Sequence, residues 1–220
     1  MTPLEASEFT RAYHSSLGRM RILGGAPALD LANTLHWRDG ALADFIPDFE
    51  SLTHWCVPAG LLNEKEADAV LQQARKHKVK AAVVHGKVLL LRDALKTWLV
   101  VSATNLNKGV APKIADVRAI KSAIILAAGS ESLGGILWLP PKRQIEALNL
   151  PLLRCVVAIS ALMLFPIDGD IRQCEADQCG GFFINQSRSK PRRWCSMDGC
   201  GNRAKATRFR QAQSRLPSIV

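Results

Sequence analysis

Four of the six cysteines lie close together near the C-terminal end of the chain, in two pairs with the same internal spacing. The pairs are Cys174 with Cys179 and Cys195 with Cys200, each a C-x4-C, and fifteen residues separate one pair from the other. Two short cysteine pairs at such a separation suit a tetrahedral zinc site, because each pair can form a tight turn that directs two thiolates at one ion. The spacing therefore predicts one structural zinc ion held by four sulfur atoms.

Other uses of four cysteines fit the sequence less well. Two disulfides would need an oxidising compartment, and residues 1–16 are polar and lack the apolar stretch of a secretory signal. A redox dithiol normally uses C-x-x-C and not C-x4-C. An iron–sulfur cluster also takes four thiolates, but its usual cysteine spacings differ. Zinc is the favoured interpretation, with disulfides, free thiols and a cluster as alternatives. Four thiolates close the zinc site, which argues against zinc catalysis.

The residues around the cysteines predict the local structure of a finger. Residues 180–181 are glycines, placed where a tight turn favours residues without a Cβ. Residues 182–184 predict a short strand, and Trp194 predicts a return strand that leads into Cys195. A helix is expected over 202–213. Two tight turns, a hairpin between them and a helix after the last cysteine describe a treble-clef-like zinc finger.

Positive charge is concentrated in the same part of the chain. The net charge is +10, and residues 171–220 hold ten basic and three acidic residues, which gives +7 there (10 − 3) and leaves +3 for the first 170 residues. This asymmetry predicts a polyanionic partner, for which nucleic acid is the first choice, and the alternative is a solubilising basic tail. The residues expected to contact nucleic acid are Arg188, Lys190, Arg192, Arg193, Arg203, Lys205, Arg208 and Arg210.

The sequence around the second cysteine pair resembles the bacterial CGNR zinc-finger family. The motif stands here as Cys200-Gly201-Asn202-Arg203, and the match extends through residues 192–197 and to Lys205 and Arg208. The resemblance implies membership among DNA-binding transcription regulators. In that family the finger follows an N-terminal domain called ABATE, whose opening motif resembles residues 29–34, LDLANT. The resemblance also implies that zinc is ligated by Cys174, Cys179, Cys195 and Cys200.

Polar residues on and beside this N-terminal motif predict a second site. A helix expected over 27–35 places Asp30, Asn33 and Thr34 on one side, with Arg38 just beyond its end. A carboxylate, an amide and a guanidinium can fix a polar ligand, so Asp30, Asn33 and Arg38 form a predicted pocket for a small-molecule effector. The alternative, which the residues alone favour, is that Asp30 pairs with Arg38 while Asn33 bonds a neighbouring backbone.

The rest of the chain predicts a mainly α fold of ordinary soluble composition, 48% hydrophobic and 22% charged. Cys56 and Cys155 lie in apolar surroundings and are expected to be buried thiols in a cytoplasmic protein. Helices are expected at residues 49–57, 63–74, 79–108, 112–128 and 150–165, and short strands within 20–25 and 130–141. The predicted domains are a flexible lead-in (1–19), a helical ABATE-like domain (20–166) and the zinc finger (170–215).

The sequence offers no positive sign of an enzyme or of a membrane protein. The five histidines are scattered, and no phosphate loop, nucleophile elbow or H-E-x-x-H motif occurs. Charged residues interrupt each long apolar stretch, so no membrane span is expected. The favoured function is a DNA-binding transcription regulator. The alternatives are a zinc-stabilised module that binds protein or RNA, and an enzyme with a pocket near Asp30 and Asn33.

Overall fold

The computed structural model describes residues 22–38, 41–106, 147–177, 179–187 and 189–213. The expected lead-in, the helix expected at 112–128 and the strand expected within 130–141 lie outside these residues. In the described part of the chain, no helix is long and apolar enough to cross a membrane.

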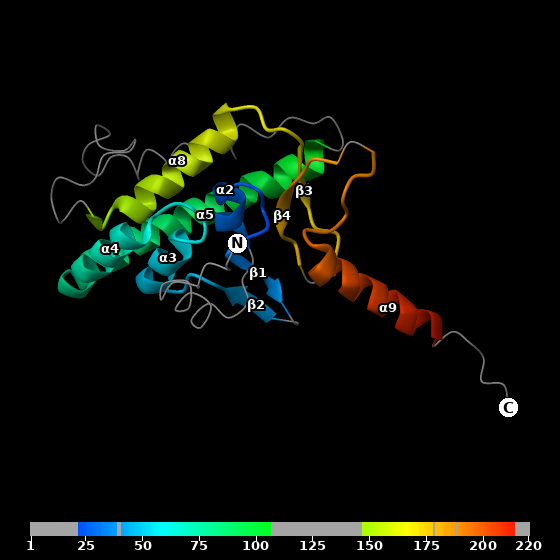
Figure 1. Cartoon of the computed structure of the whole chain (residues 1–220), viewed down its shortest axis with the longest axis horizontal. Coiled ribbons are helices and arrows are strands. Elements are labelled where there is room, and N and C mark those ends of the chain that lie inside the picture. The colour runs from blue at the N-terminus through cyan, green and yellow to red at the C-terminus, as the bar shows by residue number, and fades with distance from the viewer. Residues whose placement is uncertain (1–21, 39–40, 107–146, 178, 188, 214–220) are drawn as a thin grey trace, which may run out of the picture.

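The helical part of the molecule is built around one long helix, α5 (Lys78–Leu106). The shorter helices α2 (Pro27–Asn33), α3 (Phe49–Cys56), α4 (Glu64–Lys76) and α8 (Leu150–Leu164) all pack against it (Figure 1). The buried positions of α5 recur at intervals of three and four residues, as expected for a helix with one face toward a core. The apolar ones are Ala81, Val84, Val88, Leu91, Leu95 and Leu99.

The capping sequence and the two isolated cysteines of the helical part have the roles that the sequence predicts. Asn63 and Glu66 form a capping box at the start of α4, with the Asn63 side chain accepting from the Glu66 N–H and the Glu66 carboxylate accepting from the Asn63 N–H, both at 2.9 Å. Cys56 and Cys155 are free and buried, as expected. Burial, followed by a hydrogen bond with Cys155, raises the pKa of the Cys56 thiol well above its usual value.

The segment after α2 differs from the prediction. The expected helix ends at Asn33, and the chain continues into an antiparallel hairpin of β1 (Leu35–Arg38) and β2 (Ala41–Asp44). The hairpin is fixed to α5 by the buried Arg92, whose Nη1 and Nη2 donate to the two carboxylate oxygens of Asp44 at 2.8 and 3.0 Å. Arg92 Nη1 also donates to the Thr34 hydroxyl at 3.2 Å, so the end of α2 is held by the same guanidinium.

The finger has a different hairpin from the one predicted. Strand β4 (Phe182–Asn185) pairs antiparallel with β3 (Asp170–Gln173), and residues 194–195 belong to no strand. The predicted return strand is therefore wrong, because β4 takes its partner from upstream of the first cysteine pair. The hairpin encloses that pair. In the second pair, Cys195 lies just before a turn of π-helix, η2 (Met197–Gly201), and Cys200 lies within it; η2 leads directly into α9 (Asn202–Gln213).

Residues 22–25 also differ from the prediction, since they form no strand. Helix α9 starts at the finger and projects away from the helical body (Figure 1). The observed fold is thus mainly helical, with a small treble-clef-like finger at its C-terminal end, as the sequence predicts.

Candidate zinc site and its junction with the helical domain

The four predicted ligands meet at one point. Their sulfur atoms all lie within 4.8 Å of one another. The Sγ atoms of Cys179 and Cys195 are 3.8 Å apart, and those of Cys195 and Cys200 are 3.6 Å apart. Zinc binds thiolates at about 2.3 Å, which places the sulfurs of a regular tetrahedron about 3.8 Å apart. The cluster therefore fits one zinc ion, as the spacing of the cysteines predicts.

Three of the four sulfur atoms each accept a hydrogen bond from an N–H group. The backbone N–H of Cys195 donates to Cys174 Sγ at 3.3 Å, and the backbone N–H of Gly181 donates to Cys179. The Arg203 guanidinium donates to Cys200 Sγ at 3.2 Å. Donors of this kind stabilise the charged thiolate that binds the metal.

The electrostatics of the cluster favour thiolates at two positions. A hydrogen bond from Cys179, then one from Cys195, lowers the pKa of Cys174 to about 7. Hydrogen bonds from Cys174 and the other thiols, together with the Arg203 guanidinium, also lower the pKa of Cys200. The same hydrogen bonds between the thiols raise the pKa values of Cys179 and Cys195. All four sulfurs are therefore deprotonated only when a cation such as zinc lies between them.

The two turns that carry the cysteines are stabilised in different ways. After the first pair, Gly180 adopts a left-handed conformation with φ +65°, which favours glycine. Within the second pair, the Ser196 hydroxyl accepts from the Gly199 N–H at 3.2 Å and caps the turn of η2.

Strand β4 lies between two hydrophobic clusters. Phe182, 1% exposed, belongs to the core of the helical domain, whereas Phe183, fully buried, packs among the cysteines. Successive side chains of a strand point to opposite faces, so one four-residue strand can serve both clusters. The finger is thereby packed directly onto the helical domain.

Asn33 bonds the same strand from the helical side. Its amide Nδ2 donates to the Phe182 carbonyl at 2.8 Å, and its Oδ1 accepts from the Phe182 N–H at 2.7 Å. The Ile184 N–H donates to the Gly24 carbonyl at 2.9 Å. Asn33 and the segment before α2 thus complete the outer edge of β4, and the motif LDLANT forms the junction with the finger.

Asp30 has a backbone-bonding role on its own side of the junction. Its Oδ1 accepts from the N–H groups of Leu23 and Gly24, at 2.9 and 2.8 Å, and burial raises the pKa of the carboxyl. Arg38 lies at the end of β1, and its side chain is outside the described residues. The pocket of Asp30, Asn33 and Arg38 stays a prediction, while two of its three side chains hold backbone groups.

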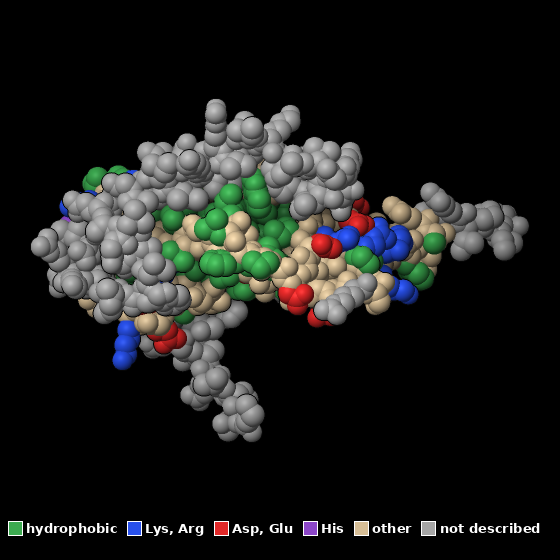
Figure 2. All heavy atoms as spheres, turned by 90° about the horizontal axis from the view of Figure 1, so that it is seen from above, with side chains coloured by type: hydrophobic (Ala, Val, Ile, Leu, Met, Phe, Trp, Pro, Cys, Tyr) green, Lys and Arg blue, Asp and Glu red, His purple; other side chains and the backbone are tan. Residues whose placement is uncertain are grey.

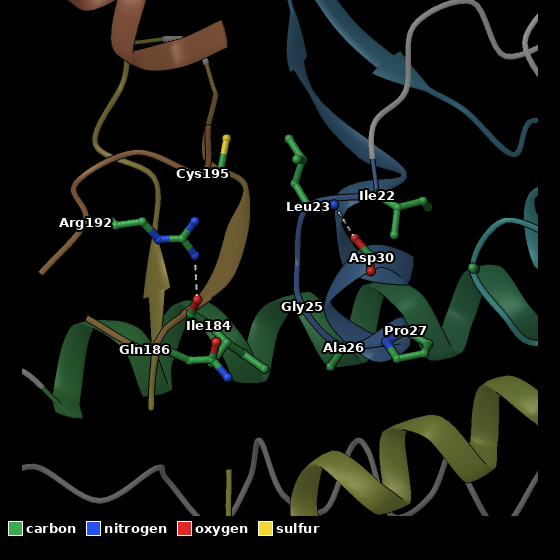
Figure 3. Close-up of a pocket in the computed structure, with 11 residues that line it drawn as sticks. Ile22, Leu23, Gly25, Ala26, Pro27, Asp30, Ile184, Gln186, Arg192 and Cys195 are labelled. Carbon is green, nitrogen blue, oxygen red and sulfur yellow. Dashed lines mark hydrogen bonds between the residues drawn. The ribbon is translucent and has the colours of Figure 1, made fainter. Parts of the chain in front are cut away.

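A cavity of about 480 Å³ lies between the finger and the segment before α2 (Figure 3). Arg192, Cys195 and Ile184 line it from the finger, and Leu23 and Asp30 line it from the helical domain. No sequence pattern indicates this cavity, because its two sides are far apart in the chain.

Four of the predicted nucleic-acid residues lie on α9, where the structure leaves them exposed. They are Arg203, Lys205, Arg208 and Arg210. Helix α9 has no buried residue. Figure 2 shows Lys and Arg side chains gathered at the finger end of the molecule, with hydrophobic side chains over its middle.

The other predicted residues belong to the segment between β4 and η2. Arg192 Nη2 donates to the Ile184 carbonyl at 2.7 Å, and Arg193 Nε lies 2.5 Å from the Glu175 carboxylate. Lys190 is exposed, and Arg188 lies outside the described residues. Arg192 and Arg193 therefore help to order the finger itself, a role that the sequence did not indicate.

Trp194 links this segment to α9. The guanidinium carbons of Arg193 and Arg208 lie over its ring, at 5.4 and 5.7 Å from the centroid. Contacts of this kind between a cation and an aromatic face are attractive. The Arg208 contact holds the middle of α9 against the zinc-bearing segment.

Comparison with known protein families matches both parts of the chain. Residues 171–213 match the model of the CGNR zinc finger, and residues 25–161 match ABATE, described as "Putative stress-induced transcription regulator". No curated protein and no solved structure matches the chain. The order of the two matches is the order that the resemblance in the sequence implies. Because the ABATE model covers more than half of the chain, the protein belongs to the ABATE family, and its C-terminal part is a CGNR zinc finger.

Proposed function

We propose that this protein regulates transcription by binding duplex DNA through its zinc finger, with α9 in the major groove. The observation that carries the proposal is the distribution of charge around α9. The helix has four basic residues and no acidic residue in the sequence NRAKATRFRQAQ. Zinc and the Trp194 contacts order this helix before it meets a partner, which reduces the entropy lost on binding.

The basic residues of α9 form two rows. At about 100° per residue, Lys205 and Arg208 fall on one flank of the helix, and Arg203 and Arg210 fall on the opposite flank. Phe209 lies between the two rows on the outward side and is 64% exposed.

Basic residues on two opposite sides of α9 suit a partner that surrounds the helix, such as a DNA groove, better than a flat surface. A flat anionic surface can meet one flank of a helix at a time. The major groove of B-DNA is about 12 Å wide and admits a helix about 10–12 Å across, with phosphates along both walls. In that position both rows meet phosphates, and Phe209 faces the base edges, where thymine methyl groups offer apolar contacts.

The test compares two double variants that remove the same charge. Lys205→Ala with Arg210→Ala takes one residue from each row, and Lys65→Ala with Lys80→Ala removes two exposed lysines from α4 and α5. Each phosphate contact adds about 0.9 to the slope of log affinity against log salt concentration. We expect the α9 pair to lower that slope by about 1.8, and the control pair to leave it near the wild-type value.

Equal slopes in the two double variants would contradict a DNA-binding role for α9. A wild-type protein that binds no duplex DNA, but captures single-stranded RNA or an acidic protein, would support the alternative of a zinc-stabilised interaction module. Both outcomes are measured by the same fluorescence titration over a range of salt concentrations.

The proposal includes a non-catalytic role in the cytoplasm. Four thiolates fill the coordination sphere of the metal, so the site supports folding and not substrate activation. Unpaired cysteines in a zinc site require a reducing compartment.

For the helical domain we propose that a small, mainly apolar effector is bound. A second cavity of about 420 Å³ lies beside α8, lined by Val157, Ala161 and Phe165, and the finger's Ile184 contributes to its wall. Ala161→Trp should fill this cavity from the exposed side of α8. An effector found by thermal-shift screening should stabilise the wild type and not the variant; equal stabilisation of both would exclude this cavity.

A further inference from the structure

We propose that Cys195 is a modification site: a hydroperoxide oxidises this zinc ligand before the other three, and its oxidation dismantles the finger. The proposal rests on three independent features of Cys195, which are its hydrogen bonds, its exposure and its neighbours.

The first feature is the absence of an N–H donor. Cys174, Cys179 and Cys200 each accept one N–H, from Cys195, Gly181 and Arg203 respectively. Within the described residues, the hydrogen bonds of Cys195 Sγ run only to the sulfurs of the cluster. An N–H donor draws charge away from a metal-bound thiolate and makes it a weaker nucleophile. Cys195 therefore retains the most nucleophilic sulfur of the four.

The second feature is access. Cys195 is half-buried while the other three cysteines are buried, and it lines the cavity of about 480 Å³ at the junction. Figure 3 shows Cys195 and Arg192 on the finger side of this cavity, with Leu23 and Asp30 on the other. Its walls are polar and apolar in similar measure, with Ile22, Leu23 and Pro27 among the apolar residues, and it can admit a small uncharged reactant. Hydroperoxides are uncharged at neutral pH.

The third feature is a suitable set of neighbours for the reaction. The Cys195 sulfur attacks the terminal oxygen of the hydroperoxide, an S–O bond forms, the O–O bond breaks, and the leaving oxygen takes up a proton. The Arg192 guanidinium lines the same cavity and can donate N–H groups to that oxygen. The Cys200 thiolate, 3.6 Å away, then attacks the sulfenic acid; a disulfide forms and hydroxide leaves. Two thiolates supply the two electrons that reduce the peroxide.

The disulfide removes two of the four ligands, so the site loses its affinity for zinc. The reactivity of Cys195 does not depend on the function proposed above. Only the consequence for DNA binding rests on it, and the two are measured separately.

The first experiment maps the modified residue in the zinc-loaded wild-type chain. Substoichiometric hydrogen peroxide is added in the presence of dimedone, which traps sulfenic acid, and peptides are identified by mass spectrometry. Zinc release is followed with a chromogenic chelator. We expect the label on Cys195 to exceed that on any other cysteine by about tenfold, the effect of one charge-assisted hydrogen bond. An even distribution, or a first label on Cys174, Cys179 or Cys200, would overturn the proposal.

A second experiment tests the cause without removing a zinc ligand. Arg203→Ala deletes the N–H donor to Cys200, and Arg210→Ala deletes an equal charge further along α9. In Arg203→Ala the label should appear on Cys200 as well as Cys195, while Arg210→Ala should keep the wild-type pattern. A wild-type pattern in both variants would show that the donors do not set the reactivity, and the proposal would fail.

The last experiment concerns regulation. Peroxide-treated protein should lose duplex binding, and thiol reductant with zinc should restore it. If the untreated protein binds no DNA while Cys195 is labelled first, the function proposed above fails and the reactive site stands. Full DNA binding by the oxidised, zinc-depleted protein would refute the regulatory consequence.

Discussion

At Asp30 a buried carboxylate fixes the segment that precedes α2 by accepting two backbone N–H groups. Asparagine has a similar shape and can present the same acceptor oxygen without a charge. Asp30→Asn should therefore fold with wild-type stability or better, whereas Asp30→Ala leaves both N–H groups without an acceptor and should lose about 1–3 kcal/mol. Urea unfolding followed by circular dichroism checks both values. A large loss in Asp30→Asn would show that the charge itself is required.

The difference in stability between the wild type and Asp30→Asn should depend on pH. Burial raises the folded-state pKa of Asp30 above its ordinary value of 3.8, so the folded wild type binds a proton more readily than the unfolded chain. The resulting stabilisation is full below pH 3.8 and is lost as the pH rises through the folded-state pKa. The free energy of unfolding of wild type minus that of Asp30→Asn should thus decrease as the pH rises from about 3.5. An increase over that range would contradict the assignment.

Asn33 should affect the finger from a position in the helical domain. Asn33→Ala removes both hydrogen bonds to Phe182 and should cost about 1–3 kcal/mol, with weaker zinc retention. Asn63→Ala, which removes the cap of α4, costs about 1 kcal/mol and serves as the control. Zinc competition with a chelator distinguishes the two. Equal zinc retention in both variants would mean that Asn33 does not couple the finger to the helical domain.

At the residue scale, predictability depends on sequence separation. The zinc ligands could be identified because each pair is local and metal chemistry requires their spacing. The partner of Asn33 could not, since Phe182 lies 149 residues away. Spacing in the chain says nothing about which strand edge an amide will meet.

At the scale of elements, we expect substitution of the two neighbouring phenylalanines of β4 to have two different effects. Phe182→Ala should destabilise the helical domain by about 3–5 kcal/mol, because it opens a cavity in the larger core. Phe183→Ala should act mainly on the zinc site, where this ring packs among the cysteines and under the Arg192 guanidinium. Thermal unfolding at 222 nm measures the first effect and zinc competition the second. Identical profiles would contradict the division of β4 between two cores.

Comparison of the predicted and observed elements shows which sequence patterns predict structure here. Apolar residues and the capping box identified α3, α4, α5 and α8, and α9 was expected from its place after the last cysteine. The β1–β2 hairpin was missed although Asp39-Gly40 stands between its strands, a sequence that favours a two-residue turn. The predicted return strand at Trp194 was wrong because strand pairing depends on the whole finger, and β4 pairs with β3 on its other side in the chain.

At the scale of the whole molecule, the metal should stabilise more than the finger. Removal of zinc frees β4 and with it Phe182, whose burial is worth about 3 kcal/mol. At about 2–4 °C per kcal/mol for a chain of this size, the helical domain should melt about 6–12 °C lower in the presence of a strong chelator. Re-addition of zinc should restore the melting temperature. An unchanged helical transition in fully zinc-free protein would show that β4 stays in place without the metal.

The shared strand also limits how such a protein can change over time. If the finger contributed only its zinc site, another zinc finger could replace it without any change in the helical domain. Here the exchange would also replace Phe182 in the core and the backbone that Asn33 bonds. A different finger would preserve the fold only if its strand placed a side chain of similar shape in the core position of Phe182. The finger and the helical domain are therefore expected to evolve together.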